Sequence, residues 1–93
     1  MTDSVQTRTV EITNIRGLHA RAAAKFCDLA SRFDANVEVA KDNLTVGGCS
    51  LMDLLMLGAG KGSSITLMAE GKEAEKALAA LADLVTDRFG EGQ

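Results

Sequence analysis

Two kinds of hydrophobic periodicity alternate along this chain of 93 residues, and their order limits the folds that it can adopt. Short segments that alternate apolar and polar residues, or that lie between turn signals, are typical of strands. Strands are therefore predicted over residues 9–14, 36–41, 44–46 and 63–69. Segments with apolar residues at helical spacing predict helices over residues 20–33, 51–57 and 73–88. The predicted element order is β-α-β-β-α-β-α.

This order favours an α+β fold in which the helices are segregated to one face of a sheet. We expect an open-faced β-sandwich, with a four-stranded, mostly antiparallel sheet and three helices on one side. The first helix has a predicted buried stripe of Ala23, Phe26, Cys27, Ala30 and Phe33. The last helix has a corresponding stripe of Ala74, Ala77, Leu78, Leu81, Leu84 and Val85.

Composition and length indicate one small domain over residues 1–93, with a core over about residues 9–89. The chain contains no proline and no linker-like stretch, and its apolar fraction of 46% and charged fraction of 25% are those of an ordinary globular domain. Both ends are expected to be frayed, and residues 90–93 in particular are glycine-rich and polar.

Charge and hydropathy exclude several classes of protein. A net charge of −3 argues against binding to nucleic acid, which requires a basic surface. The sequence has no run of eighteen apolar residues, and residues 1–8 are polar, so neither membrane insertion nor a secretory signal is expected. We therefore predict a cytoplasmic monomer in which Cys27 and Cys49 are thiols.

His19, the single histidine, lies where the first helix is predicted to begin. The first N–H groups of a helix lack partners within it, and with the helix dipole they form an anion site. An imidazole nitrogen is also a competent nucleophile. A phosphoryl group on His19 would be stabilised by the amides of Ala20, Arg21 and Ala22 and by the guanidinium of Arg21 or Arg16. The alternative is a surface histidine that only caps the helix.

Three sequence blocks together resemble one family. GLHARAAAKF, VGGCSLMDLLML and AEGKEAEKALAALADLV are similar to the histidine-containing phosphocarrier (HPr) family of bacterial phosphotransferase systems, over about residues 9–91. The resemblance implies the same open-faced fold and a phosphocarrier instead of an enzyme. It implies that His19 accepts phosphate on Nδ1 from enzyme I, which is charged by phosphoenolpyruvate, and passes it to an enzyme IIA domain. Arg21 matches the family's motif arginine, and no metal or cofactor is implied on this chain.

The chain departs from the family motif at Ala22, where proline is usual. Proline in a first helical turn lacks an N–H group that would be unpaired in any case, so alanine adds one amide near the phosphate. This variant, with the segments VGGCS and LMLGA, is similar to the nitrogen-type branch of α-proteobacteria. Whether the phosphate ends on a sugar or on a regulatory enzyme IIA is left open by the resemblance.

Ser50 is predicted as the N-cap of the short second helix, with Asp53 three residues later in a capping-box pattern. The resemblance also places Ser50 on the regulatory serine that HPr kinase/phosphorylase modifies in some bacteria. Cys49 precedes it where a lysine is frequent in those relatives. Phosphate at a helix N-terminus need not disturb the fold, but it would repel acidic partners.

The second predicted helix carries six apolar residues among seven, more than one small sheet can cover. Leu54 and Leu57 are assigned to the core, and the others to a surface suited to docking. From the resemblance we expect a partner-binding patch beside His19. It consists of Ala20, Ala24, Lys25, Asp28, Leu51, Met52 and Leu55.

Two functions of other classes remain as alternatives. The first is a regulatory binding module that responds to Ser50 while His19 is idle. The second is a ligand- or RNA-binding α+β domain, which the absence of a basic surface disfavours. A zinc site is not expected, because His19, Cys27 and Cys49 lack the paired ligand spacing of such sites.

Overall fold

The computed structural model describes residues 5–93. Its strands are Gln6–Glu11 (β1), Asn36–Lys41 (β2), Leu44–Gly47 (β3) and Ser64–Glu70 (β4). Its helices are Ala20–Ala30 (α1), Leu51–Met56 (α2) and Ala74–Thr86 (α3), followed by the short 3-10 helix Arg88–Gly90 (η1). The predicted element order is confirmed.

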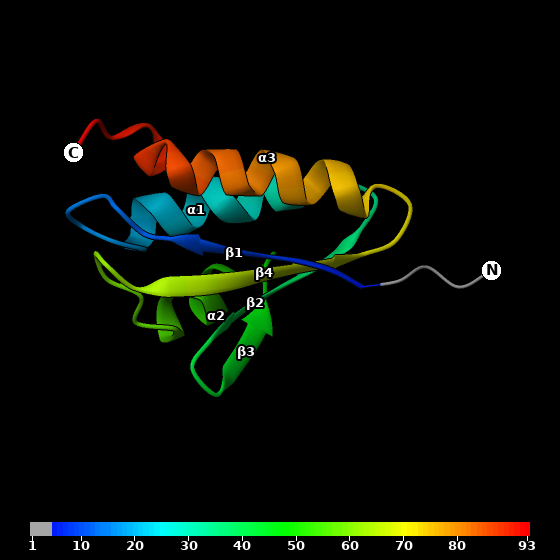
Figure 1. Cartoon of the computed structure of the whole chain (residues 1–93), viewed down its shortest axis with the longest axis horizontal. Helices are drawn as coiled ribbons and strands as arrows, with labels where there is room; N and C mark the ends of the chain where they lie inside the picture. The colour runs from blue at the N-terminus through cyan, green and yellow to red at the C-terminus, as the bar shows by residue number, and fades with distance from the viewer. Residues whose placement is uncertain (1–4) are drawn as a thin grey trace.

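The four strands form one sheet in the order β1-β4-β2-β3, and all three adjacent pairs are antiparallel. Helices α1 and α3 lie side by side along this sheet, and α2 packs against α1 (Figure 1). Hydroxyl groups of Thr9 and Thr66 form an exposed hydrogen bond of 3.2 Å between β1 and β4. The predicted α+β open-faced sandwich is therefore confirmed.

The core lies between the sheet and the helices, where alternate strand residues point. Paired positions Val37–Ala69 and Val39–Leu67 join β2 to β4, and these four side chains are buried. The predicted helical stripes are buried at most positions, and Cys27, Phe33 and Leu84 pack against the edge of the core. Within residues 5–93, no helix has the length and apolar character needed to cross a membrane.

The first strand begins and ends earlier than the sequence pattern predicted. Pairing with β4 runs from Gln6–Ala69 to Glu11–Ser64, so residues 12–14 lie beyond the ladder. Ile12 nevertheless stays buried in the core, and its N–H group donates to the carbonyl of Ser63 at 2.8 Å. The length of the partner strand, which local periodicity does not report, sets this boundary.

Both long helices are shorter than predicted. Helix α1 ends at Ala30, where the hydroxyl of Ser31 donates to the carbonyl of Asp28 at 2.7 Å and the chain tightens into turns. Helix α3 ends at Thr86, because Arg88 and Phe89 adopt positive φ angles of 56° and 53°. This turn directs the Phe89 side chain into the core, where it is fully buried.

Residues 90–93, which were expected to be frayed, contact the rest of the domain. The carbonyl of Gln93 accepts from the N–H group of Ile15 at 3.1 Å, and Lys25 donates through Nζ to the carbonyl of Phe89 at 2.7 Å. Buried Phe89 anchors the start of this segment, so the last residues lie beside the start of α1 (Figure 1). Residues 1–4, also expected to be frayed, lie outside the described residues.

Gly17 brings the segment before α1 close to the segment before β4. Its φ angle is +64°, and a Cβ atom there would lie 2.7 Å from both the carbonyl oxygen of Ala59 and Cα of Gly60. The next N–H group, that of Leu18, donates to the same Ala59 carbonyl at 2.8 Å. A side chain at position 17 would therefore press backbone against backbone where α1 begins.

We predict that Gly17→Ala lowers the free energy of unfolding by about 1–3 kcal/mol, because it adds both a strained φ angle and a backbone clash. Urea denaturation of the two proteins measures this difference. Gly60→Ala is the matched control, because a Cβ atom at Gly60 meets nothing within 4 Å and its φ angle is not positive. Equal stabilities of the two variants would contradict the prediction.

Candidate functional site

His19 caps the N-terminus of α1, as predicted. Its backbone is extended, with φ −79° and ψ −178°, and its carbonyl accepts the N–H group of Ala23 at 2.8 Å. Its Nδ1 atom accepts the N–H group of Arg21 at 3.3 Å. The ring thus satisfies one of the amides that a helix leaves unpaired at its start, and Nδ1 faces the first turn.

The other ring nitrogen faces the C-terminal segment. Nε2 of His19 contacts Oε2 of Glu91, and Oε1 of Glu91 accepts from Nδ2 of Asn14 at 2.9 Å. The side chain of Asn14 is fully buried and also donates to the carbonyl of Gly17 at 2.8 Å. The side chains of His19 and Glu91 are only 16% and 14% exposed, so this end of the chain shields one edge of the ring.

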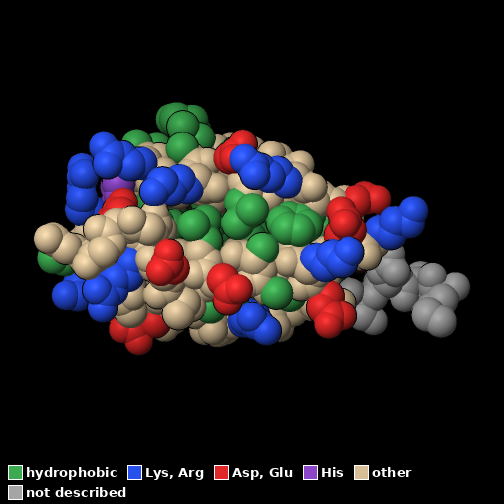
Figure 2. Space-filling model, turned by 90° about the horizontal axis from the view of Figure 1, so that it is seen from above, with side chains coloured by type: hydrophobic (Ala, Val, Ile, Leu, Met, Phe, Trp, Pro, Cys, Tyr) green, Lys and Arg blue, Asp and Glu red, His purple; other side chains and the backbone are tan. Residues whose placement is uncertain are grey.

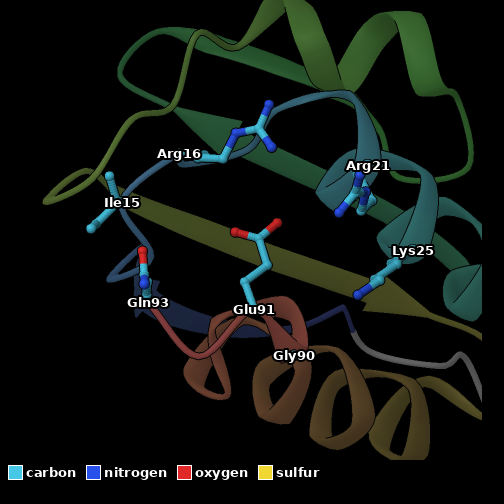
Figure 3. Close-up of a pocket in the computed structure, with 7 residues that line it drawn as sticks. All are labelled: Ile15, Arg16, Arg21, Lys25, Gly90, Glu91 and Gln93. Carbon is cyan, nitrogen blue, oxygen red and sulfur yellow. The ribbon is translucent and has the colours of Figure 1, made fainter.

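A cavity of about 380 Å³ adjoins these residues. Arg16, Arg21 and Lys25 line it together with Glu91, and the Glu91 carboxylate points toward the two arginines (Figure 3). Figure 2 shows the same feature at the surface, where lysine and arginine side chains gather around the histidine at one end of the molecule. Three cations and one carboxylate give this region a positive balance in a chain whose net charge is −3.

The environment of Glu91 favours its charged form. The hydrogen bond with His19 lowers the pKa of this carboxyl, and the bond from Asn14 and the nearby charges of His19 and Arg16 act in the same direction, against the effect of burial. The contact is therefore strongest above the ordinary pKa of a glutamate and is lost as pH falls through the lowered value.

The three residues whose amides were predicted to bind phosphate differ in their contact with the His19 ring and in their exposure. Among the described residues, Arg21 is the one of the three predicted amide donors whose N–H group contacts the imidazole, and its side chain lines the cavity. Ala20 is exposed at the first position of α1, whereas the side chain of Ala22 is fully buried. The amide of Ala22 belongs to the same first turn.

Ser50 caps α2, as predicted. Its hydroxyl accepts the N–H group of Asp53 at 3.3 Å, and the residue is only partly exposed. Such a cap typically contributes about 1 kcal/mol to stability. Asp53 lies in the first turn of α2, where its negative charge complements the helix dipole.

The predicted docking residues lie mostly at the surface. Leu54 and Leu57 are buried, as expected, whereas Leu51 is 38% and Met52 is 68% exposed. Of the predicted patch residues, Ala20, Ala24, Lys25, Asp28, Leu51 and Met52 are exposed and Leu55 is half-buried. Met56, which was assigned to the surface but not to the patch, is 67% exposed, and the 61% exposure of Ile15 was not predicted.

Sequence reasoning missed Asn14 and Glu91. An asparagine after a strand is typical of a turn, and a glutamate between two glycines is typical of a mobile end. The burial of Phe89 brings Glu91 to the histidine, across 72 positions of sequence. A buried aromatic residue after the last helix is the one sequence signal that could have indicated a docked C-terminus.

An open-faced α+β sandwich with a single histidine at the start of its first helix is the architecture of a phosphocarrier. The family model described as the PTS HPr component phosphorylation site matches residues 6–87. The phosphocarrier protein HPr of Neisseria meningitidis is 45% identical over 86 residues, which cover 92% of this chain and 97% of that protein. The phosphocarrier protein NPr of Shewanella violacea is 44% identical over 84 residues, covering 90% and 92%.

Comparison with solved structures indicates the same family. An HPr from Thermoanaerobacter tengcongensis superposes with a TM-score of 0.89 at 44% identity, covering 92% of this chain and 97% of that one. This chain belongs to the HPr family and is a phosphocarrier of the phosphotransferase system. As a member of this family it carries a phosphoryl group and is not an enzyme with turnover of its own.

We predict that acidification breaks the contacts of the Glu91 side chain with His19 and Asn14, because protonation removes the negative charge of the carboxylate that accepts these hydrogen bonds. The pH titration of the Asn14 side-chain amide and of the Ile15 amide in ¹H–¹⁵N spectra measures this release. Both signals should shift with one midpoint below about pH 4.3, the ordinary value for glutamate. Midpoints at or above that value, or a midpoint unchanged in Glu91→Gln, would contradict the assignment.

Proposed function

We propose that His19 is the residue that carries the phosphoryl group, on Nδ1. The observation that carries this proposal is the hydrogen bond from the Arg21 N–H group to Nδ1, because a nitrogen that accepts a hydrogen bond holds its lone pair. That lone pair is what attack on phosphorus requires. Enzyme I is the proposed donor and a histidine of an enzyme IIA domain the proposed acceptor.

When His19 is phosphorylated, the bond between Nδ1 and phosphorus forms as the donor's bond to phosphorus breaks, and the donor atom keeps the electron pair. In the onward transfer the bond between Nδ1 and phosphorus breaks as the acceptor's bond to phosphorus forms, and Nδ1 keeps the electron pair. The transition state is loose, so the protein contributes mainly alignment and charge stabilisation. The first-turn amides of Ala20, Arg21 and Ala22 and the Arg21 guanidinium provide these in our proposal. Arg16 and Lys25 add positive charge at the same cavity.

The exposed face formed by α1 and α2 is the proposed docking surface for both partners. Leu51, Met52 and Leu55 supply apolar contact there, and Ala20, Ala24, Lys25 and Asp28 supply the adjoining face of α1. Complexes of this kind are short-lived and have small interfaces. We propose a monomer as the working unit and place that monomer in the cytoplasm with its partners.

Ser50 is the proposed site of regulatory phosphorylation by an HPr kinase/phosphorylase. The hydroxyl is partly exposed at the N-terminus of α2, beside the exposed Leu51 and Met52. A phosphate there would keep its place at the helix start while adding negative charge to the docking surface. Incubation with such a kinase and ATP should then give acid-stable phosphate that Ser50→Ala abolishes.

Mixing the protein with enzyme I and phosphoenolpyruvate should give acid-labile, base-stable phosphate on this chain. His19→Ala should abolish it, because it removes the nucleophile, and Ser50→Ala should leave it intact. Radiolabelled phosphoenolpyruvate followed by acid or base treatment measures both. Acid-labile phosphate retained in His19→Ala would contradict the proposal, and loss in Ser50→Ala would favour the alternative of a module that works through Ser50.

We predict that Arg21→Ala slows phosphorylation of His19 by about a hundredfold, the usual cost of removing one donor to a transition-state oxyanion. Arg16→Ala, which removes the same charge from the same cavity, should cost clearly less, because Arg16 lies outside the helical turn that holds Nδ1. Rapid-quench measurement of the first turnover compares the two variants. Equal losses would show that only net charge matters.

A further inference from the structure

We propose that Glu91 is a positioning residue for phosphoryl transfer, because it holds the His19 ring with its proton on Nε2 and leaves the Nδ1 lone pair free. The inference rests on the proposed role of His19 as the carrier. It assigns a role to the C-terminal segment, which follows the last long helix and lies beyond residues 6–87, the part matched by the family model.

The neighbours of the ring determine its tautomer. An ionised carboxylate can only accept hydrogen bonds, and a backbone N–H group can only donate. Glu91 contacts Nε2, so this nitrogen carries the proton. The Arg21 N–H group points at Nδ1, so that nitrogen carries the lone pair. Two contacts made by opposite edges of the ring thus select the same neutral form.

The carboxylate is itself held in place. Its other oxygen accepts from the fully buried Asn14 side chain at 2.9 Å, and Asn14 is fixed in turn by its 2.8 Å bond to the Gly17 carbonyl. The Ile15 N–H group holds the chain two residues further on, at the carbonyl of Gln93. The ring is therefore oriented from a buried anchor and not from a free end.

This arrangement also suits the charge that the reaction creates. When Nδ1 bonds to phosphorus while Nε2 keeps its proton, the ring becomes an imidazolium cation, and no proton has to leave. The adjacent Glu91 carboxylate offsets that positive charge, as the carboxylate partner of a histidine does in hydrolase triads. In the onward transfer the bond between Nδ1 and phosphorus breaks, its electron pair returns to Nδ1, and the ring leaves as neutral imidazole.

The test uses Glu91→Gln in the full chain, with Glu75→Gln as the matched control. Glu75 is an exposed carboxylate in the first turn of α3, and its loss changes the net charge equally. The Glu91 carboxylate accepts with both oxygens, whereas a glutamine side chain has one acceptor oxygen and one NH₂ group that can only donate. At position 91 this NH₂ group would lie against a second donor, either Nδ2 of Asn14 or Nε2 of His19. Because His19 is the single histidine in the chain, ¹⁵N imidazole spectra report this ring alone.

We expect wild-type protein and Glu75→Gln to show the pattern of a proton on Nε2 at a pH where the ring is neutral. Glu91→Gln should show a mixture of both tautomers and a rate of phosphorylation by enzyme I that is lower by about tenfold. A chain that ends at Gly90 should reproduce both changes. Circular dichroism confirms that the variants are folded.

Spectra and rates of Glu91→Gln that match those of Glu75→Gln would overturn the inference. A slower rate with an unchanged ¹⁵N pattern would also overturn it, since the loss would then come from charge or partner contact and not from ring position. Failure of the carrier role looks different: wild-type protein would gain no acid-labile phosphate at all. That result would overturn the proposed function and this inference with it.

Discussion

The hydrogen bond between the Arg21 N–H group and Nδ1 of His19 connects the fold of this protein with its chemistry. The same contact lies at the start of α1 and orients Nδ1, the nucleophile in the proposed function, so the position of this atom depends on a helix end and not on a loop. At 3.3 Å the bond is long for an N–H donor and therefore weak. In the proposed function the phosphoryl oxygens replace Nδ1 as the acceptor of this N–H group, because an unpaired amide at a helix start binds anions.

The start of the helix is fixed by the two segments that flank β1 and β4. The backbone of Ile12 accepts the Gly62 N–H group at 2.7 Å and donates to Ser63 at 2.8 Å, and Leu18 donates to Ala59 at 2.8 Å. Gly17 makes this approach possible, since any side chain there would meet the opposite backbone. The sheet thus positions the histidine through backbone contacts, while the buried face of α1 fixes the direction of the helix.

The parts of the structure that depend on residues close together in the sequence were predictable from it. The β2 strand, the cap at Ser50 and the start of α1 at His19 each follow from a local pattern of apolar residues, turn residues or capping groups. The ends of α1 and α3 and the docking of residues 90–93 were not, because distant contacts decide them. The turn after α3 places two residues other than glycine at positive φ, a conformation that burial of Phe89 stabilises and that no local preference favours.

The C-terminal segment shields one edge of the His19 ring and leaves the edge of the proposed reaction open. Glu91 occupies the Nε2 edge of the ring, whereas phosphate is expected on the Nδ1 edge, which faces the first turn of α1. The segment can therefore remain bound while the other edge reacts. At the cavity, Arg16, Arg21 and Lys25 outnumber the Glu91 carboxylate, so the local charge is opposite in sign to that of a phosphoryl group. In a chain of net charge −3, this local excess of positive charge would attract the anionic donor group of the proposed function toward His19.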